Sequence, residues 1–274
     1  MSKYFRITIT HSVLVWGVLL MIIPLWLIFA SSTHSNSIIY SEGMQWKVGS
    51  ELINNYDRVL NKTGGFTKEI TASKIFLNSF IMAFGIATLS VIVSMMAAYS
   101  LVYFKTKFSS FFFWAIFITL LVPLELRILP SYQIVSDLNL TNSYAGLILP
   151  LSASAIATFF FRQYFRSIPD ELLEAAKLDG ANSWKFFVDF LLPLSKTMIA
   201  AMFIFMFVYG YNQYLWPLIM TTSEKYWTVV MGLKMLGVGG SADRYSYIIL
   251  SLLTPVLIII FLQRLFIQGL FQSK

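Results

Sequence analysis

SIPDELLEAAKLDGANSWKFFVDFLLP, residues 167–193, is a charged segment that interrupts a series of apolar runs. The 274-residue chain is 57% hydrophobic and only 12% charged, values typical of proteins that cross a membrane several times. Because backbone polar groups in lipid must be paired within the protein, apolar runs of about 20 residues indicate helices. The sequence therefore predicts an all-α membrane protein in which a polar helix-turn-helix connects two spans.

The apolar runs predict six transmembrane helices within one domain, residues 1–274. The expected spans cover about residues 13–30, 75–104, 108–129, 144–161, 197–220 and 247–267. A polar outer loop, residues 31–74, follows the first span and includes an expected short helix near residues 51–60. The loop that carries the charged segment, residues 162–196, lies between the fourth span and the fifth.

The first apolar run follows Lys3 and Arg6 and ends at the small residues Ala30-Ser31-Ser32, a pattern that also fits a signal peptide. We expect the run to be retained as a span. It is longer than the roughly 7 to 15 apolar residues of a signal core. It also contains Pro24, which a spanning helix with neighbours tolerates.

Basic residues beside the spans predict the orientation of the chain. They are Lys105, Lys107, Arg162 and Arg166. Because cytoplasmic loops carry an excess of lysine and arginine near span ends, both termini and the charged segment are expected in the cytoplasm.

Composition excludes several kinds of site. The chain contains no cysteine, which rules out disulfides, thiolate metal sites and cysteine nucleophiles. The histidines, His11 and His34, are too few for a histidine-rich metal site. The net charge of +7 comes from scattered residues, so no basic run indicates nucleic-acid binding. We expect no catalytic residue, no metal and no nucleic-acid partner.

The charged segment contains signals for two short helices. Ser167 is expected to cap the first, with Asp170 in the first turn where the helix dipole favours negative charge. Gly180 should end this helix because glycine adopts the left-handed conformation cheaply. Asn182 can then cap a second helix that contains Trp184.

Two interpretations of this segment remain open from the residues alone. It could be an amphipathic hairpin that lies on the headgroups, with Trp184 and Phe187 as anchors. Alternatively, it docks into a protein, because small alanines allow close approach and acidic side chains suit a basic partner. The residues that favour docking are Glu174, Ala175, Ala176 and Asp179.

The charged segment resembles the loop signature of importer-type ABC transporter permeases. In that signature three residues separate Glu-Ala-Ala from a glycine, and nine further residues separate the glycine from Ile-x-Leu-Pro. The corresponding residues are Glu174-Ala175-Ala176, Gly180 and Phe190-x-Leu192-Pro193. Phe190 replaces the isoleucine of the family pattern.

Other stretches resemble the maltose-permease-like carbohydrate-uptake group, and most closely the permeases for glycerol 3-phosphate. They are residues 77–80, 113–114, 116–120, 123–127, 170–172 and 209–218. The resemblance implies an inner-membrane permease that works with a second, homologous permease, an ATPase homodimer and a periplasmic or surface solute-binding protein. It also implies that Glu174, Ala175, Ala176, Asp179 and Gly180 couple the permease to the ATPase.

The chain lacks the Gly-x4-Gly-Lys-Ser/Thr loop that holds nucleotide phosphates, so ATP and magnesium are expected on the partner ATPase and no cofactor on this chain. Charged side chains within membrane segments are costly, which singles out Glu125 and Arg127. They could pair with each other or with headgroups. Alternatively, Arg127 could bind a substrate phosphate, because guanidinium groups match phosphate oxygens.

Polar and aromatic side chains in the fifth span are further candidates for the substrate pathway. They are Tyr211, Asn212, Gln213, Tyr214 and Trp216. Such residues could bind a hydroxylated solute or join helices to one another. Pro217 is expected to kink this span because it removes a backbone hydrogen bond.

The function expected from these features is the import of glycerol 3-phosphate, with another sugar or polyol of the same group as the alternative substrate. Two other classes are less well supported. A secondary carrier would show internal symmetry and buried charged relays. A membrane-embedded lipid enzyme would need a cluster of catalytic side chains.

Overall fold

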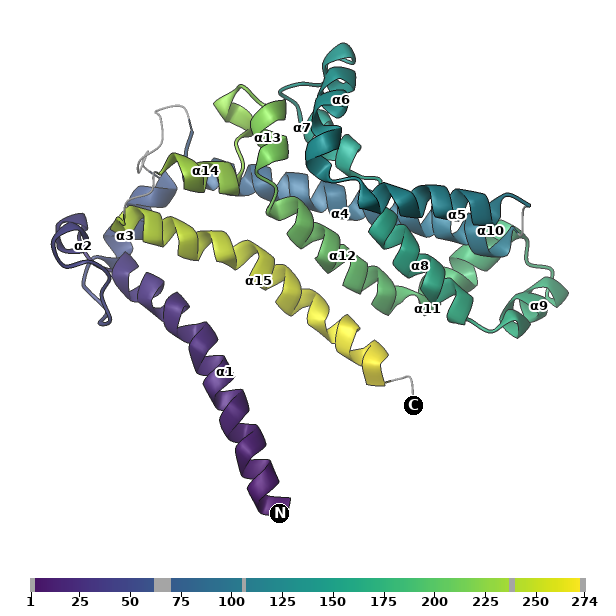
Figure 1. Cartoon of the computed structure of the whole chain (residues 1–274), viewed down its shortest axis with the longest axis horizontal. Coiled ribbons are helices and arrows are strands. Elements are labelled where there is room, and N and C mark those ends of the chain that lie inside the picture. The colour runs from purple at the N-terminus through teal and green to yellow at the C-terminus, as the bar shows by residue number, and fades with distance from the viewer. Residues whose placement is uncertain (1–2, 62–69, 105–106, 237–239, 272–274) are drawn as a thin grey trace. The chain divides into compact units, whose positions relative to one another are not determined.

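The computed structural model describes residues 3–61, 70–104, 107–236 and 240–271, which form helices joined by short connections (Figure 1). The all-α class expected from composition is confirmed over these residues. Lys105 lies outside them. The sequence predicts one domain, whereas the contacts within the chain group its residues into two units. One unit holds residues 1–76 and 231–253, and the other holds residues 77–230 and 254–274.

Among the described residues, three helices are each long and apolar enough to cross a membrane. They are Ile7–Ser32 within α1 (Lys3–Ser32), the whole of α4 (Ala72–Tyr103), and Ala242–Gln263 within α15 (Ala242–Phe271). Three more candidates are helix pairs bent at short breaks, so counting each pair as one span gives six. The bends are 107° between Ser109–Leu121 and Glu125–Asp137, 46° between Tyr144–Leu151 and Ala155–Ser167, and 75° between Ser183–Leu194 and Lys196–Tyr211.

The first unit contains α1 and two short helices of the polar loop. These are α2 (Asn36–Glu42) and α3 (Leu52–Asn61), and the unit also includes the beginnings of α4 and α15 and most of α14 (Val229–Met235). Ser35 caps α2 by accepting a hydrogen bond from the Ile38 N–H. α3 lies where the sequence predicts a short helix.

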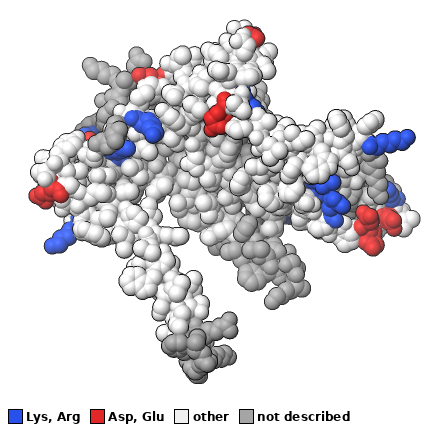
Figure 2. Space-filling view, viewed as in Figure 1, with Lys and Arg blue, Asp and Glu red and all other residues white. Residues whose placement is uncertain are grey.

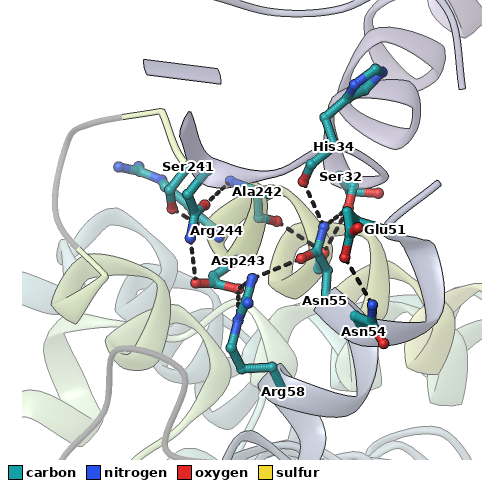
Figure 3. Close-up of polar contacts among 12 residues, drawn as sticks. Ser32, His34, Glu51, Asn54, Asn55, Arg58, Ser241, Ala242, Asp243 and Arg244 are labelled. Carbon is teal, nitrogen blue, oxygen red and sulfur yellow. Dashed lines mark hydrogen bonds and ion pairs between the residues drawn. The ribbon is translucent and has the colours of Figure 1, made fainter. Parts of the chain in front are cut away.

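A cluster of polar side chains joins α3 to the start of α15 (Figure 3). The buried Asn55 donates to the carbonyl oxygens of Ser32 (2.8 Å) and His34 (2.7 Å). Arg58 donates to the Asn55 side-chain oxygen and pairs with Asp243 in the first turn of α15. The loop after α1 is therefore fixed by side-chain bonds as well as by apolar packing.

The second unit contains most of α4 and a series of shorter helices. In chain order they are α5 (Ser109–Ile118), η1 (Thr119–Leu121), α6 (Leu124–Asp137), α7 (Tyr144–Ile148), η2 (Leu149–Leu151), α8 (Ala155–Ser167), α9 (Asp170–Leu178), α10 (Ser183–Lys185), η3 (Phe186–Leu191), α11 (Leu192–Leu194), α12 (Lys196–Tyr211), α13 (Leu215–Met220) and η4 (Glu224–Tyr226). Within this unit, α9 and α10 lie near the start of α12, and α7 and α13 lie near its end (Figure 1).

The third and fourth expected spans break where proline interrupts them. Residues 108–129, predicted as one span, divide at Val122, and Pro123 begins the turn into α6. Pro130 lies inside α6. Pro150 lies in η2, and the side chain of Ser154 restarts the helix by accepting from the Ala157 N–H.

The fifth expected span, residues 197–220, is also divided. α12 ends at Tyr211, three residues without helix follow, and α13 starts at Leu215. The interruption includes Gln213, whose carbonyl a proline four residues later blocks in a continuous helix, so the break agrees with the kink expected from Pro217. Pro217 lies near the start of α13, where a missing N–H has no cost.

Close contacts hold α4 against its neighbours in the second unit. The buried Asn78 donates to the carbonyl oxygens of Lys225 (2.8 Å) and Trp227 (2.9 Å) and accepts from the Tyr144 hydroxyl (2.7 Å). At Gly210 of α12, a β-carbon would lie only 3.1 Å from the Cα of Ala83. Gly210 thus allows the α12 backbone to approach α4 closely.

Candidate functional site

The charged segment begins a new helix near the predicted position but with a different cap. α9 follows Pro169 and carries Asp170 and Glu171 in its first turn, where the helix dipole favours carboxylates. Ser167, predicted as the cap, is the last residue of α8, and its hydroxyl donates to the Tyr164 carbonyl at 2.7 Å. Because α8 extends this far, the hydroxyl is already used and the capping prediction is wrong.

The end of α9 agrees with the prediction. Gly180 has φ +79°, and its N–H donates to the Lys177 carbonyl at 3.0 Å. The N–H of Ala181 donates to the Ala176 carbonyl at 2.9 Å, which completes a Schellman motif. Asn182 then caps α10 by accepting from the Lys185 N–H at 2.8 Å. Hydrogen bonds thus define the turn between α9 and α10.

α9 exposes most of its surface. Glu174, Ala175, Asp179 and Gly180 are exposed, whereas Ala176 is only 1% exposed. Of the expected alanine pair, only Ala175 is therefore open to a partner, and Ala176 packs within the chain. Figure 2 shows side chains of both charges gathered at the right-hand end of the view, where Figure 1 places α9.

Aromatic side chains of residues 184–190 pack within the protein instead of anchoring the segment to lipid headgroups. Phe187 is buried, and its ring centroid lies 5.0 Å from that of Tyr99 in α4, so the prediction of Phe187 as an anchor is wrong. Trp184 is exposed and stacks on Phe187. Phe190, which replaces the isoleucine of the family pattern, is half-buried and stacks on Phe186 at 5.9 Å. The larger ring is therefore accommodated by a neighbouring aromatic.

A cavity of about 290 Å³ lies where two of the bent spans break. Its wall combines residues of the break after η1 with residues of the break between η2 and α8, and α12 completes it. Backbone outside helices is tolerated at membrane depth only where protein covers it or where it lines a cavity. The two breaks thus meet at the kind of place where a membrane protein binds a solute.

Polar and aromatic side chains line part of this cavity. Arg127 and Ser131 belong to α6, Ser154 caps α8, Tyr209 belongs to α12, and Trp216 belongs to α13. Among the described residues that line the cavity, Arg127 is the one with a charged side chain. A guanidinium with nearby hydroxyl and aromatic groups suits a small hydroxylated anion.

Arg127 and Trp216, both candidates for the substrate pathway, line this cavity. The Trp216 indole N–H already donates to the Leu147 carbonyl at 3.1 Å. Trp216 therefore contributes its aromatic ring to the cavity wall, and not a hydrogen-bond donor. Glu125 is exposed in the first turn of α6 and is absent from the described wall. The structure shows no ion pair between Glu125 and Arg127, both of which it describes.

Four other expected pathway residues are not among the described residues that line the cavity. They are Tyr211, Asn212, Gln213 and Tyr214. Tyr211 is buried, stacks on Phe207 and hydrogen-bonds with Thr254. Gln213 donates to the Tyr209 carbonyl at 3.3 Å, close to the end of α12. These residues shape the interruption between α12 and α13.

Sequence reasoning missed several residues of the cavity wall. Thr119, Ser131, Ser154 and Tyr209 have no distinguishing signal in apolar runs, and only the helix breaks bring them together. The prolines of residues 123 and 150 were the available signal, because each marks a break that opens onto the cavity. Among the described residues, no three His, Asp or Glu side chains are placed to hold a metal ion.

Comparison with known proteins agrees with this architecture. Residues 90–272 match the family described as binding-protein-dependent transport system inner membrane component. The sn-glycerol-3-phosphate transport system permease protein UgpE of Escherichia coli (strain K12) is 41% identical over 271 residues, or 97% of this chain and 96% of that protein. The protein of the same name from Yersinia pestis is 41% identical over 269 residues, 96% of this chain and 95% of its own length.

A solved structure shows the same fold. The crystal structure of a bacterial ABC transporter involved in the import of the acidic polysaccharide alginate matches with a TM-score of 0.78 and 22% identity. The match covers 96% of this chain and 98% of that chain. This chain is therefore a non-catalytic, multi-pass subunit that works in a complex with a separate ATPase and a binding protein. It belongs to the binding-protein-dependent transport system inner membrane components, the permease subunits of ABC importers.

Proposed function

We propose that this permease forms part of the pathway for sn-glycerol 3-phosphate in an ATP-driven importer of the inner membrane. The observation that carries the proposal is the 41% identity, over 97% of the chain, to permeases named for that substrate. The cavity at the broken spans gives chemical support, because Arg127 provides positive charge where hydroxyl and aromatic groups also lie.

Within the cavity, Arg127 is the candidate for binding the phosphate. A guanidinium donates two parallel hydrogen bonds to phosphate oxygens, which gives strength and orientation together. The hydroxyls of Thr119, Ser131 and Ser154 would bind the glycerol hydroxyls, and Trp216 would cover the carbon chain. Glu125, Tyr211, Asn212, Gln213 and Tyr214 border the pathway and set the shape of the breaks around it.

α9 is the proposed contact with the ATPase. Glu174 and Ala175 would rest in a cleft of one ATPase subunit, with Asp179 and Gly180 at the rim, while Ala176 keeps α9 seated on its own chain. Closure of the ATPase on nucleotide would move α9 and thereby bias the permease between its inward-facing and outward-facing states.

The proposed complex contains a second, homologous permease, an ATPase homodimer and a periplasmic or surface solute-binding protein, within the lipid bilayer. ATP and magnesium would bind to the ATPase, and this chain would carry no cofactor of its own. Both termini and α9 would lie in the cytoplasm, as the basic residues beside the spans indicate.

A neutral sugar or polyol is the second candidate substrate. The cavity wall also suits a neutral substrate, because most of its polar and aromatic side chains are uncharged. Arg127 distinguishes the two candidates, because only an anionic substrate gains from its charge.

The test is uptake into proteoliposomes that contain the complete complex, with ATP available to the ATPase. Labelled sn-glycerol 3-phosphate, glycerol and maltose are offered in parallel. We expect ATP-dependent uptake of the phosphorylated substrate, a loss of about tenfold or more in Arg127→Gln because a charge-assisted hydrogen bond is lost, and partial retention in Arg127→Lys. Lys47→Gln, which removes an exposed charge from the polar loop, is the control. Equal uptake of a neutral polyol by wild type and Arg127→Gln would favour the second candidate.

A further inference from the structure

Three tyrosine hydroxyls donate hydrogen bonds to backbone carbonyls on the two sides of α9. The pairs are Tyr103 with Phe165 (3.3 Å), Tyr99 with Ser183 (2.7 Å) and Tyr164 with Leu194 (2.7 Å). The first carbonyl precedes α9 along the chain, and the other two follow it. The segment that carries α9 is therefore tied at both ends by side-chain bonds.

Two of the accepting carbonyls belong to helix ends, where the last carbonyls lack their usual intrahelical partners. The Phe165 carbonyl also accepts from the Ile168 N–H at 3.3 Å. Phe165 is in the last turn of α8, and Leu194 is the last residue of α11, next to the 75° bend into α12. Ser183 is the first residue of the short α10. A tyrosine hydroxyl donates at each point, and at Phe165 and Ser183 its bond adds to that of a backbone N–H.

One face of α4 contacts both sides of the segment. Tyr99 and Tyr103 are four residues apart, so they lie one above the other on the helix. The Tyr103 ring lies 6.1 Å from the Phe165 ring before α9 and 5.3 Å from the Phe186 ring after it. The Tyr99 ring lies 5.0 Å from that of Phe187. α4 is thus positioned to sense displacement of either flank of α9.

The segment after α9 includes an unusual helix at this contact. Phe186–Leu191 forms a π-helix, and Phe186, Phe187 and Leu191 are its buried residues. π-helical turns are rare and occur frequently at functional sites. Here the π-helix presents two adjacent aromatic rings to the tyrosines of α4, which connects the turn after α9 to the span rather than to solvent.

We propose that Tyr99, Tyr103 and Tyr164 are positioning residues for energy coupling, which hold the segment that carries α9 so that its displacement moves α4 and α12. This inference rests on the proposed contact of α9 with the ATPase. α9 itself is held to its chain mainly by Ala176, its buried residue. Force applied to α9 by a partner must therefore pass through the two flanks, which the tyrosines attach to the spans.

Replacement of tyrosine by phenylalanine separates the hydrogen bonds from simple aromatic packing. The ring and its contacts remain, and only the donated bond is lost. If the tyrosines only fill space, Tyr99→Phe and Tyr103→Phe leave coupling unchanged. If they position α9, the complex still assembles and hydrolyses ATP, but fewer substrate molecules enter for each ATP.

The first measurement is substrate uptake per ATP hydrolysed in proteoliposomes that contain the complete complex. We expect this ratio to fall about fivefold in each of Tyr99→Phe and Tyr103→Phe, the change that follows from the loss of one hydrogen bond. Tyr56→Phe is the matched control, because its hydroxyl lies 3.0 Å from that of Ser32 and both residues belong to the unit that does not contain α9.

The second measurement is the distance between α9 and α4 in the assembled complex, and it needs no substrate. Because the chain contains no cysteine, Leu178→Cys and Met96→Cys introduce a unique pair of spin-label sites. These positions are 89% and 50% exposed. We expect a narrow distance distribution in the wild-type background and in Tyr56→Phe, and a distinctly wider one in Tyr99→Phe and Tyr103→Phe.

A wider distribution together with a lower uptake ratio would support the inference. An unchanged width, or an unchanged ratio, in both tyrosine variants would overturn it. Failure of the wild-type complex to take up sn-glycerol 3-phosphate would instead refute the proposed substrate, and the width of the distance distribution would still test whether the tyrosines hold α9. A width that does not respond when the ATPase is removed would count against the proposed docking of α9.

Discussion

The ion pair between Arg58 and Asp243 offers a quantitative test of how the first unit is held together (Figure 3). The Nη2 atom of Arg58 lies 2.6 Å from Oδ1 of Asp243, and Nε lies 2.8 Å from the same oxygen. Asn36 donates to the other carboxylate oxygen at 3.0 Å. Asp243 also lies in the first turn of α15, where the helix dipole favours its charge. We predict that Asp243→Ala destabilises this unit more than Arg58→Ala does.

The magnitude follows from the exposure of the two side chains, 38% for Arg58 and 18% for Asp243. Exposed ion pairs contribute about 0.2–1 kcal/mol, whereas removal of one partner of a buried pair costs about 3–5 kcal/mol. This pair lies between those limits. Asp243→Ala should cost about 2 kcal/mol, because it leaves two donors without their acceptor. Arg58→Ala should cost about 1 kcal/mol, since the carboxylate keeps Asn36, the helix dipole and some solvent.

The assay is hydrogen exchange of residues 36–61 in the lipid-reconstituted protein. A loss of about 2 kcal/mol predicts roughly thirtyfold faster exchange through local opening, and a loss of about 1 kcal/mol predicts roughly fivefold. Asp57→Ala is the control, because that exposed carboxylate accepts from Asn61 of the same helix and so joins no other element. Equal exchange in Asp243→Ala and Asp57→Ala, or a larger effect of Arg58→Ala, would refute this reasoning.

Three further outcomes follow from the second unit. Asn78→Ala should reduce the free energy of unfolding by about 2–4 kcal/mol and lower the unfolding temperature, because the buried side chain loses three hydrogen bonds. An unfolding temperature equal to that of wild type within error would contradict this. Gly180→Ala should lower the stability of α9 by about 1 kcal/mol through backbone strain at φ +79° alone, because a β-carbon there meets no atom within 4 Å. Hydrogen exchange of α9 should then become about fivefold faster, and unchanged exchange would exclude this strain. Glu174→Arg should release the ATPase on copurification, unlike Lys177→Arg, and full retention would remove Glu174 from the contact.

The fold class and the charged segment were predictable because they depend on local sequence signals. Apolar runs indicate helices whatever surrounds them, and Gly180 and Asn182 perform locally the roles that their residue types favour. The position of the α9 cap was not predictable, because α8 continues through Ser167 and occupies the hydroxyl that was expected to cap the next helix.

The cavity could not be predicted because it depends on contacts between distant parts of the chain. Hydropathy does not distinguish a straight span from two helices that meet at Pro123 or Pro150. The role of Asn78 is equally hidden, since its partners at Lys225 and Trp227 are 147 and 149 residues away. In the sequence, residues 77–80 are distinguished only by their resemblance to the carbohydrate-uptake permeases. The structure shows that Asn78 joins α4 to the residues around Lys225 and Trp227 by hydrogen bonds.

The proposed role of α9 requires it to lie on the cytoplasmic side of the membrane, where the ATPase is. Leu178→Cys introduces a single, exposed thiol on α9 into a chain without cysteine, and its reaction with a membrane-impermeant maleimide is measured from each side. We expect the thiol to react from the cytoplasmic side only, and to be protected when the ATPase is bound. Full reaction from the outer side, or equal reaction with and without the ATPase, would contradict it.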